Sequence, residues 1–315
     1  MTYATFGSDR LNNRSSERMV VMKIGFIGLG IMGKPMSKNL LNAKYSLTVF
    51  DRNRKAVDEL AALGAAEAKN GAEVAKSSDV VITMLPNSPN VKDAVFGEHG
   101  IAEGAHPGLS LIDMSSIDPT ATREIGTQLD NVGIGMLDAP VSGGEPKAID
   151  GTISVMVGGK KELFDQYDDL LKAMAGSVTY VGGLGSGNVA KLANQIIVAL
   201  NIAAVSEAFV FAQKMGVSPD LVYQAIRGGL AGSTVMDSKA PMMMDRTFAP
   251  GFRVELHIKD LNNALNAAHS VNSPVPLTAS VREILTALQA DHLEKEDHSG
   301  IVKYYEKLAN TTLHR

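Results

Sequence analysis

A glycine-rich turn between two short apolar runs constrains the fold more than any other feature of this sequence. Residues 23–28 form an apolar run that ends in glycine, which predicts a buried strand. The residues from Gly28 to Gly33 read G-L-G-I-M-G, and apolar side chains recur every three or four positions from there to Ala43, which predicts a helix. A run rich in β-branched and aromatic residues at 46–50 predicts the next strand.

The same alternation continues for about another hundred residues. Strand patterns occur at 80–84, 109–114, 152–157 and in a segment ending at 138–141, with helical patterns at 54–63, 91–96 and 120–129. Strands that alternate with helices are typical of βαβ units with right-handed crossovers. We therefore expect an α/β protein with an N-terminal Rossmann-type, doubly wound, mostly parallel sheet.

The pattern changes at the glycine cluster of residues 182–187. Nearly every later segment has helical periodicity, with breaks that resemble helix–helix connections at 217–219, 249–251 and 272–276. We expect a first domain at 23–184 and an all-helical domain at 185–315. The cluster itself is expected to be a hinge, because the strand and acidic residue that should follow a phosphate-binding turn are missing.

The composition is that of an ordinary globular protein, and it excludes several classes of site. The 315 residues suit two domains, and a net charge of −4 without a basic tract argues against a nucleic-acid partner. The absence of cysteine excludes disulfides, thiolate metal sites and a cysteine nucleophile, and it fits a reducing, cytoplasmic location. Residues 1–22 are polar and lack the apolar core of a signal peptide, so a disordered tail or extension is expected.

The most apolar stretch, residues 196–212, is shorter than a membrane span and contains Glu207. We expect a buried helix there and no membrane partner.

The histidines give little sign of chemistry. His292 and His298 lie among four acidic residues, but they lack the spacing of a helical metal-binding pair, so a solvated charged loop and no metal are expected. His257 precedes Lys259 by two positions, which places the pair on different helix faces, and we assign His257 no role.

Each glycine of the turn at 28–33 has a task that a bound dinucleotide explains. Gly28 permits the tight turn, Gly30 lets the backbone approach a pyrophosphate, and Gly33 lets the helix pack closely on the strand. The N-terminus of the helix offers free N–H groups and a partial positive charge to the phosphates. The alternative is a glycine turn that binds nothing. The residues expected to contact the dinucleotide here are Gly28, Leu29, Gly30, Ile31, Met32 and Gly33.

Asp51 ends the second strand pattern about 20 residues after the turn, where a carboxylate can accept hydrogen bonds from both ribose hydroxyls. Its charge would repel a 2′-phosphate, which favours NAD(H) over NADP(H). Arg52 and Arg54 could each turn toward a phosphate, so NADP(H) stays open as an alternative, and Arg52 is counted among the expected cofactor contacts.

Three loops are expected beyond the carboxyl ends of the strands, the edge at which open α/β sheets bind ligands. They are residues 85–87, 115–116 and 142–144. The third consists of small residues, Ser142, Gly143 and Gly144, whose N–H groups could hold a substrate carboxylate. In the first loop, Leu85 and Pro86 are expected to contact the cofactor. Taken alone, any of these loops could equally be an ordinary turn.

A hydride reductase needs a proton donor beside the carbonyl oxygen that it reduces. Lys191 lies in the first turns of the long helical pattern, with Asn194 and Gln195 on the same face. Partial burial and the positive end of the helix would both lower the lysine pKa toward neutrality. A surface lysine at a domain interface is the alternative, and these residues alone leave the two open.

Several longer segments resemble signature motifs of the β-hydroxyacid dehydrogenase family. They are G-F-I-G-L-G-I-M-G-K-P-M from Gly25, D-A-P-V-S-G-G from Asp138 and G-N-V-A-K-L-A-N from Gly187. The segments T-M-L-P-N-S-P from Thr83 and H-I-K-D-L from His257 are similar to the branch that reduces tartronate semialdehyde. The resemblance implies a Rossmann domain, an all-helical C-terminal domain, and a homodimer or homotetramer formed through the helical part.

Position by position, the resemblance places the family's catalytic lysine on Lys191 and its substrate loop on residues 142–144. It also implies that Ser116 and Lys259 contact the cofactor or the substrate.

The same resemblance gives Asn194 the position that assists the lysine. Many relatives have a second asparagine where this chain has Gln195, which leaves open which amide touches the substrate. Phe252 and Asp260 are expected to close the site from the helical domain.

The resemblance implies reduction of tartronate semialdehyde (2-hydroxy-3-oxopropionate) to D-glycerate, with NAD(P)H as hydride donor and Lys191 as general acid. Reductases of glyoxylate or succinic semialdehyde, and 3-hydroxyisobutyrate dehydrogenases, share these motifs and are alternatives. A non-catalytic dinucleotide-binding scaffold protein is an alternative of another class, against which the presence of Lys191, Asn194 and the Ser-Gly-Gly loop argues.

Overall fold

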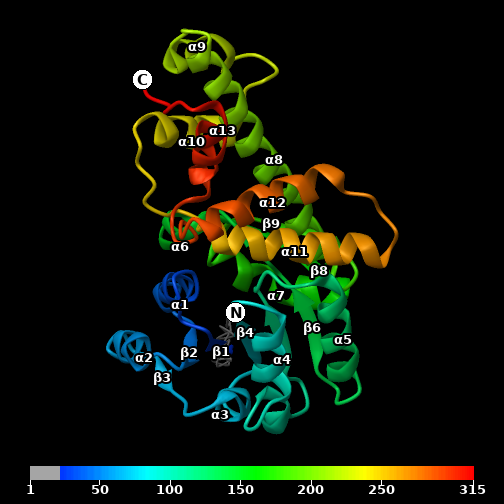
Figure 1. Ribbon diagram of the computed structural model, residues 1–315. Coiled ribbons are helices and arrows are strands. Elements are labelled where there is room, and N and C mark those ends of the chain that lie inside the picture. The colour runs from blue at the N-terminus through cyan, green and yellow to red at the C-terminus, as the bar shows by residue number, and fades with distance from the viewer. Residues whose placement is uncertain (1–21) are drawn as a thin grey trace, which may run out of the picture.

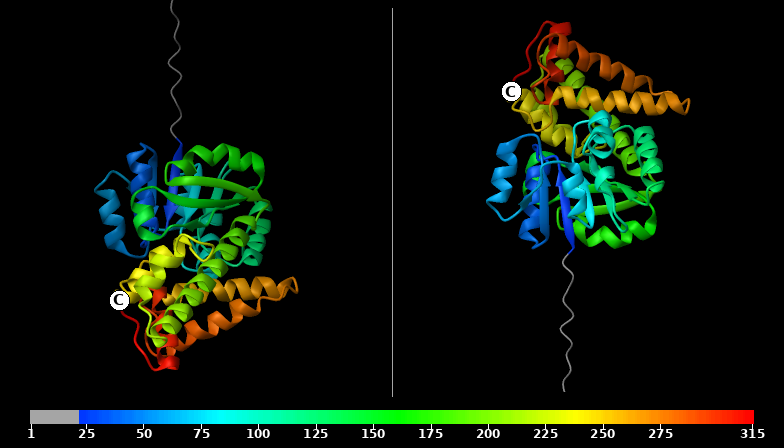
Figure 2. Two further views of the ribbon diagram at one scale, coloured as in Figure 1. Left: turned by 90° about the horizontal axis from the view of Figure 1, so that it is seen from above. Right: turned by 90° about the horizontal axis from the view of Figure 1, so that it is seen from below.

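The computed structural model describes residues 22–315, so the extension expected at 1–22 lies, except for Met22, outside the described residues. Figure 1 shows a sheet with helices on both faces and, at one end of this layer, a group of helices from the C-terminal part of the chain. Both views in Figure 2 show the same arrangement. The predicted α/β fold class is confirmed.

The sheet has the strand order expected of a Rossmann fold. The described strands are β1 (Lys23–Ile27), β2 (Ser46–Phe50), β3 (Ala66–Glu67), β4 (Val80–Thr83), β5 (Ser110–Asp113), β6 (Gly135–Asp138), β7 (Val141–Ser142), β8 (Ile153–Gly159) and β9 (Ala175–Gly182). They are ordered β3-β2-β1-β4-β5-β6-β8-β7, with β9 also paired to β8. The strands from β3 to β6 are parallel, whereas β8 runs antiparallel to β6 and β7. The strand order reverses between β1 and β4, and ligands bind beyond the carboxyl ends of the strands at such a point.

Helices cover both faces of this sheet. They are α1 (Gly33–Asn42), α2 (Arg54–Ala61), α3 (Gly71–Lys76), α4 (Ser88–Phe96), α5 (Pro119–Asp130), α6 (Gly144–Ile149), α7 (Lys161–Lys172) and the 3-10 turn η1 (Ile101–Gly104). Successive side chains of a strand point to opposite faces, so Phe26 of β1 joins the core under α1, α2 and α7, and Ile27 joins the core under α3, α4 and α5. Burial on both faces explains why these strands read as continuous apolar runs.

The sequence patterns do not predict β3, α3, α6, α7 or β9. The first three have two to six residues, which is too short for periodicity to become visible. α7 does carry an amphipathic spacing, because Phe164, Tyr167 and Leu171 are all buried on one face. The spacing of these apolar residues could therefore have predicted α7 from the sequence.

The C-terminal part is built around one long helix. Its elements are α8 (Ser186–Lys214), α9 (Pro219–Ile226), α10 (Thr234–Met244), α11 (Val254–Ser270), α12 (Pro276–Ala290), the 3-10 turn η2 (His298–Ile301) and α13 (Val302–Ala309). Phe209 of α8 is fully buried in a core shared with Leu261 of α11 and Leu285 of α12. Among the described helices, only α8 is long and apolar enough to cross a membrane, and half of its most apolar window is buried in the fold. A core helix meets the same criteria.

Candidate active site

The glycine turn joins β1 to α1 with the geometry that its sequence predicts. Gly28 has φ +100°, a conformation that side chains rarely adopt, and a Cβ on Gly33 would lie 1.9 Å from the Gly28 carbonyl oxygen. A Cβ on Gly30, in contrast, would meet nothing within 4 Å. α1 begins after Met32 without a side-chain cap. The turn thus has open space at Gly30 and leads into a helix N-terminus that no side chain caps, which fits a dinucleotide pyrophosphate.

Asp51 lies at the end of β2 beside this turn. Its carboxylate accepts hydrogen bonds from the backbone N–H groups of Leu29, at 2.5 Å, and Asn53, at 2.6 Å. The side chain of Arg54 donates to Asp58 at 2.7 Å and to Glu67 at 2.5 Å, whereas Arg52 is exposed. Of the two arginines, Arg54 is therefore already engaged by acidic partners.

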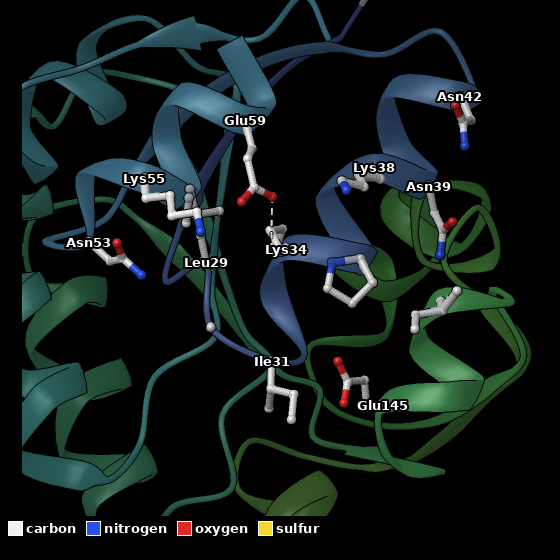
Figure 3. Close-up of a pocket in the computed structure, with 14 residues that line it drawn as sticks. Leu29, Ile31, Lys34, Lys38, Asn39, Asn42, Asn53, Lys55, Glu59 and Glu145 are labelled. Carbon is white, nitrogen blue, oxygen red and sulfur yellow. Dashed lines mark hydrogen bonds and ion pairs between the residues drawn. The ribbon is translucent and has the colours of Figure 1, made fainter. Parts of the chain in front are cut away.

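A cavity of about 700 Å³ opens beside the glycine turn, between α1, α2 and α6. Figure 3 shows Ile31 at its lower edge, Glu145 from α6 facing it, and Lys34 paired with Glu59 at 2.9 Å. Lys191 is not among its lining residues. The cavity therefore adjoins the candidate cofactor turn and stops short of the candidate catalytic lysine.

The ends of β4 and β5 are tied together by a buried carboxylate that the sequence patterns did not identify. Asp113 is fully buried and accepts from the Thr83 hydroxyl at 2.8 Å and from the Ser115 N–H at 3.1 Å. Burial raises the pKa of Asp113 to about 6, although these hydrogen bonds act in the opposite direction. The Ser115 hydroxyl in turn accepts from the Leu85 N–H at 2.8 Å, which fixes both loops at the cofactor edge.

Lys259 of α11 reaches these loops from the helical side. Its ammonium donates to the carbonyl oxygens of Ser116, at 2.8 Å, and Pro86, at 3.2 Å. It also lies 3.0 Å from the carboxylate of Asp260. The predicted contacts Pro86, Ser116 and Lys259 are thus brought together, and they join the two parts of the fold across the sheet edge.

Lys191 is buried in the second turn of α8, with 6% of its surface exposed. Its ammonium donates to the Gln195 side-chain oxygen at 3.1 Å, an oxygen that also accepts from Asn194 at 2.9 Å. The Gln195 amide nitrogen donates to Asp260 at 2.6 Å. Burial lowers the pKa of Lys191; the Asp260 carboxylate opposes this shift and the Lys259 charge adds to it. The side chains of Lys191, Asn194, Gln195 and Asp260 thus form one hydrogen-bonded network.

The start of α8 is fixed to the end of β6 by a buried aspartate. The Asp138 carboxylate accepts from the N–H groups of Gly185 and Asn188, each at 2.7 Å. A Cβ on Gly187 would lie 2.4 Å from the Met156 carbonyl oxygen, so only glycine allows the helix to approach the sheet this closely. Lys191 follows one turn later and is thereby placed near the sheet edge.

The Ser-Gly-Gly loop leads from β7 into α6. Gly143 has φ +140° and Gly144 has φ +72°, which explains why glycine occupies both positions. A Cβ on Gly144 would lie 3.4 Å from the Gly251 carbonyl oxygen, so the turn at 251–252 of the helical part lies beside this loop. The ring of Phe252 packs against the imidazoles of His257 and His298, with centroids 5.7 and 5.4 Å away.

The prediction of a solvated loop around His292 and His298 is wrong for residues 297–298. His292 is exposed, but Asp297 is fully buried and His298 is 5% exposed within η2. Asp297 gains hydrogen bonds from backbone N–H groups and an ion pair with Lys239 at 2.9 Å, which compensates its burial. Local sequence could not show these partners because they lie 45 to 58 residues away.

No group of three or more histidine, aspartate or glutamate side chains within residues 22–315 is arranged to hold a metal ion.

Known protein families match nearly the whole described chain. A family model for the NAD-binding domain of 6-phosphogluconate dehydrogenase matches residues 23–182, and a model for the NAD-binding part of NADP-dependent 3-hydroxyisobutyrate dehydrogenase matches residues 185–305. The chain belongs to the β-hydroxyacid dehydrogenase family. It is therefore an NAD(P)-dependent oxidoreductase, and the predicted family is confirmed.

Individual relatives of this family member cover most of its length. It is 44% identical to 2-hydroxy-3-oxopropionate reductase of Escherichia coli over 93% of this chain and 100% of that one. It is 34% identical to mitochondrial 3-hydroxyisobutyrate dehydrogenase of Bos taurus over 89% of this chain and 86% of that one. The solved structure of Mycobacterium tuberculosis 3-hydroxyisobutyrate dehydrogenase with L-serine superposes with a TM-score of 0.85 at 33% identity, covering 90% and 98% of the two chains.

Proposed function

We propose that this dehydrogenase reduces tartronate semialdehyde (2-hydroxy-3-oxopropionate) to D-glycerate, with Lys191 as the general acid. The observation that carries the catalytic assignment is the buried Lys191 ammonium, held by Gln195 next to the sheet edge at which Lys259 meets the cofactor loops. The choice of semialdehyde is supported by the 44% identity to the Escherichia coli reductase over its full length.

In the proposed reaction a hydride adds to the aldehyde carbon and a proton adds to its oxygen, which yields the alcohol. The nicotinamide, when bound, supplies the hydride. Lys191 stabilises the developing alkoxide with its charge and then donates the proton. A lowered pKa favours this transfer, because an ammonium whose pKa lies closer to the working pH gives up its proton more readily.

The remaining predicted residues orient the substrate and the cofactor. The N–H groups around Ser142, Gly143 and Gly144 are proposed to hold the substrate carboxylate, with Phe252 covering the loop. The hydrogen bonds of Gln195 to Lys191 and Asp260 support a role in holding the lysine, and we propose Asn194 as the amide that contacts the substrate.

We propose NAD(H) as the preferred cofactor. The Asp51 carboxylate is fixed beside the glycine turn by two backbone N–H groups, and its charge disfavours a 2′-phosphate. Arg54 is paired with Asp58 and Glu67, so Arg52 is the arginine that would serve NADP(H). The glycine turn, Leu85, Pro86 and Lys259 complete the proposed cofactor contacts.

We also propose that residues 185–315 form the substrate and oligomerisation domain, and that two or four copies associate through it. Ile197 and Phe211 of α8 and Met215 at its C-cap are 59%, 66% and 67% exposed. Their separations of 14 and 4 residues correspond to about four turns and one turn, which places them on one helix face. Light scattering after gel filtration should show an oligomer that Phe211→Glu dissociates, and a wild-type monomer would contradict this proposal.

A spectrophotometric assay of NADH and NADPH oxidation tests the reaction. Tartronate semialdehyde should give the highest kcat/KM in a panel that includes glyoxylate and succinic semialdehyde, with oxidation of 3-hydroxyisobutyrate measured in the reverse direction. A higher kcat/KM for another substrate would reassign the enzyme within its family. Lack of oxidation with every aldehyde would favour the non-catalytic scaffold.

A further inference from the structure

Two buried imidazoles lie behind the lysine network without a part in the proposed proton transfer. His257 of α11 is 1% exposed and His298 of η2 is 5% exposed. Their Nδ1 atoms are 2.9 Å apart, and their ring centroids are 4.9 Å apart. Buried polar atoms are costly unless they are hydrogen-bonded, so this pairing needs a consistent arrangement of protons.

The neighbours of the two rings determine which nitrogen carries each proton. His257 Nε2 lies 3.1 Å from the Gln195 carbonyl oxygen, which can only accept, so Nε2 must be the donor. In a neutral ring this leaves His257 Nδ1 as an acceptor, and His298 Nδ1 must then donate to it. Burial lowers the pKa of both histidines, which keeps the rings neutral.

The residue before His298 holds the turn that lies over the candidate substrate loop. The Asp297 carboxylate accepts from the N–H groups of Gly251, at 3.0 Å, and Phe252, at 3.1 Å. The Phe252 ring packs against both imidazoles, and the Gly251 carbonyl oxygen lies 3.4 Å from where a Cβ on Gly144 would stand. Residues 297–298 therefore connect the turn at 251–252 to the part of α8 that contains Gln195.

We propose that His257 and His298 form a positioning pair that sets the place of Gln195, and through it the Lys191 ammonium, relative to the substrate loop. The pair acts through the Gln195 backbone, while the side chain of that residue contacts Lys191. Neither histidine touches the reacting atoms. The inference rests on the proposed role of Lys191 as general acid.

The proton arrangement can be tested without any catalytic assay. In protein labelled with ¹⁵N at histidine, long-range ¹H–¹⁵N correlation spectra distinguish the two neutral tautomers, and single substitutions assign the signals. We expect His257 in the Nε2–H form and His298 in the Nδ1–H form near neutral pH. A charged ring at either position, or any other pair of tautomers, would overturn the proposal.

The positioning role is tested with variants that keep or remove one donor. His298→Asn retains an amide nitrogen that can reach the place of Nδ1, whereas His298→Leu leaves His257 Nδ1 without its donor. We expect kcat to fall about ten- to hundredfold in His298→Leu, as for a small misplacement of a catalytic group, and to recover largely in His298→Asn. The KM for the dinucleotide should stay unchanged in both, because the cofactor turn lies elsewhere.

Exposed His292 provides the matched control, and His292→Leu should keep wild-type kcat. Equal kcat in the leucine and asparagine variants of His298 would exclude the positioning role, since a general packing defect would not distinguish them. If wild-type protein reduces no aldehyde, the proposed function fails while the tautomer result stands. If the wild type is active and His298→Leu is equally active, only the present inference fails.

Discussion

The cofactor side of the site is formed mainly by backbone, whereas its helical side is formed by buried side chains. At the glycine turn, φ values and the lack of Cβ atoms determine the shape, and the residues involved are neighbours in sequence. Around Lys191, the shape depends on Gln195 of α8 and on His257 and Asp260 of α11, which are distant in sequence. Backbone geometry can be recognised in a short motif, whereas side-chain networks depend on the whole fold.

The largest expected effect lies on the helical side. Lys191→Ala should lower kcat roughly 10²–10⁴-fold, because it removes both the proton donor and the charge that faces the alkoxide. Dinucleotide affinity, measured by fluorescence titration with NADH, should change little. Lys214→Ala, at the exposed far end of the same helix, serves as the control. Nearly normal turnover in Lys191→Ala would show that the helical side does not supply the proton.

The cofactor side should respond to single methyl groups. Gly30→Ala should weaken dinucleotide binding by roughly ten- to a hundredfold at unchanged Tm, because its Cβ enters open space needed by the ligand. Gly33→Ala should lower both affinity and Tm, since its Cβ collides with the Gly28 carbonyl and overpacking costs about 1–3 kcal/mol. Gly228→Ala, where an added Cβ meets nothing within 4 Å, should change neither. Unaltered affinity in Gly30→Ala would mean that the dinucleotide does not approach this turn.

Two neighbours of Lys191 should shift the pH profile of kcat in opposite directions. Reduction needs the ammonium form, so kcat falls as pH rises through the Lys191 pKa. Asp260 raises that pKa, and Asp260→Asn should move the alkaline decline to lower pH. Lys259 lowers it, and Lys259→Met should move the decline to higher pH. Shifts of the same sign in both variants would show that charge at Lys191 does not govern the profile.

The smallest expected effect concerns cofactor choice. Asp51→Asn removes the charge near the ribose and retains only one good acceptor for the Leu29 and Asn53 N–H groups. We expect the ratio of NADPH to NADH efficiency to rise several-fold and the free energy of unfolding to fall by about 1 kcal/mol. Denaturant titration and paired kinetics measure both quantities. A constant cofactor ratio would place the origin of the preference elsewhere, with Arg52 as the next residue to substitute.

The sequence predicted the parts of the molecule in which function follows from local backbone. The strand–turn–helix at 23–43 and the break between sheet and helices could be located because glycine and apolar periodicity act over a few residues. The roles of Lys191 and of the Ser-Gly-Gly loop stay predictions. In the structure Lys191 is hydrogen-bonded to Gln195, and the loop lies beside the turn at 251–252.

The remaining features depend on contacts between distant residues. The burial of Asp297 and His298 results from Lys239 and from backbone groups near 251, so an acidic, histidine-containing segment gave the wrong expectation of a solvated loop. The carboxylate of Asp113 escaped notice because Thr83, which donates to it, becomes its neighbour only when β4 and β5 pair.

The hydrogen bonds of Lys259 to Pro86 and Ser116 affect how freely the sequences of the sheet part and the helical part can change independently. Both acceptors are carbonyl oxygens, which every amino acid provides, so the contact depends on the path of the loops and is indifferent to their side chains. Mutations that alter loop chemistry can therefore accumulate without breaking the connection. A chimera that joins this helical part to the sheet of a relative should dock correctly wherever the loop lengths are preserved.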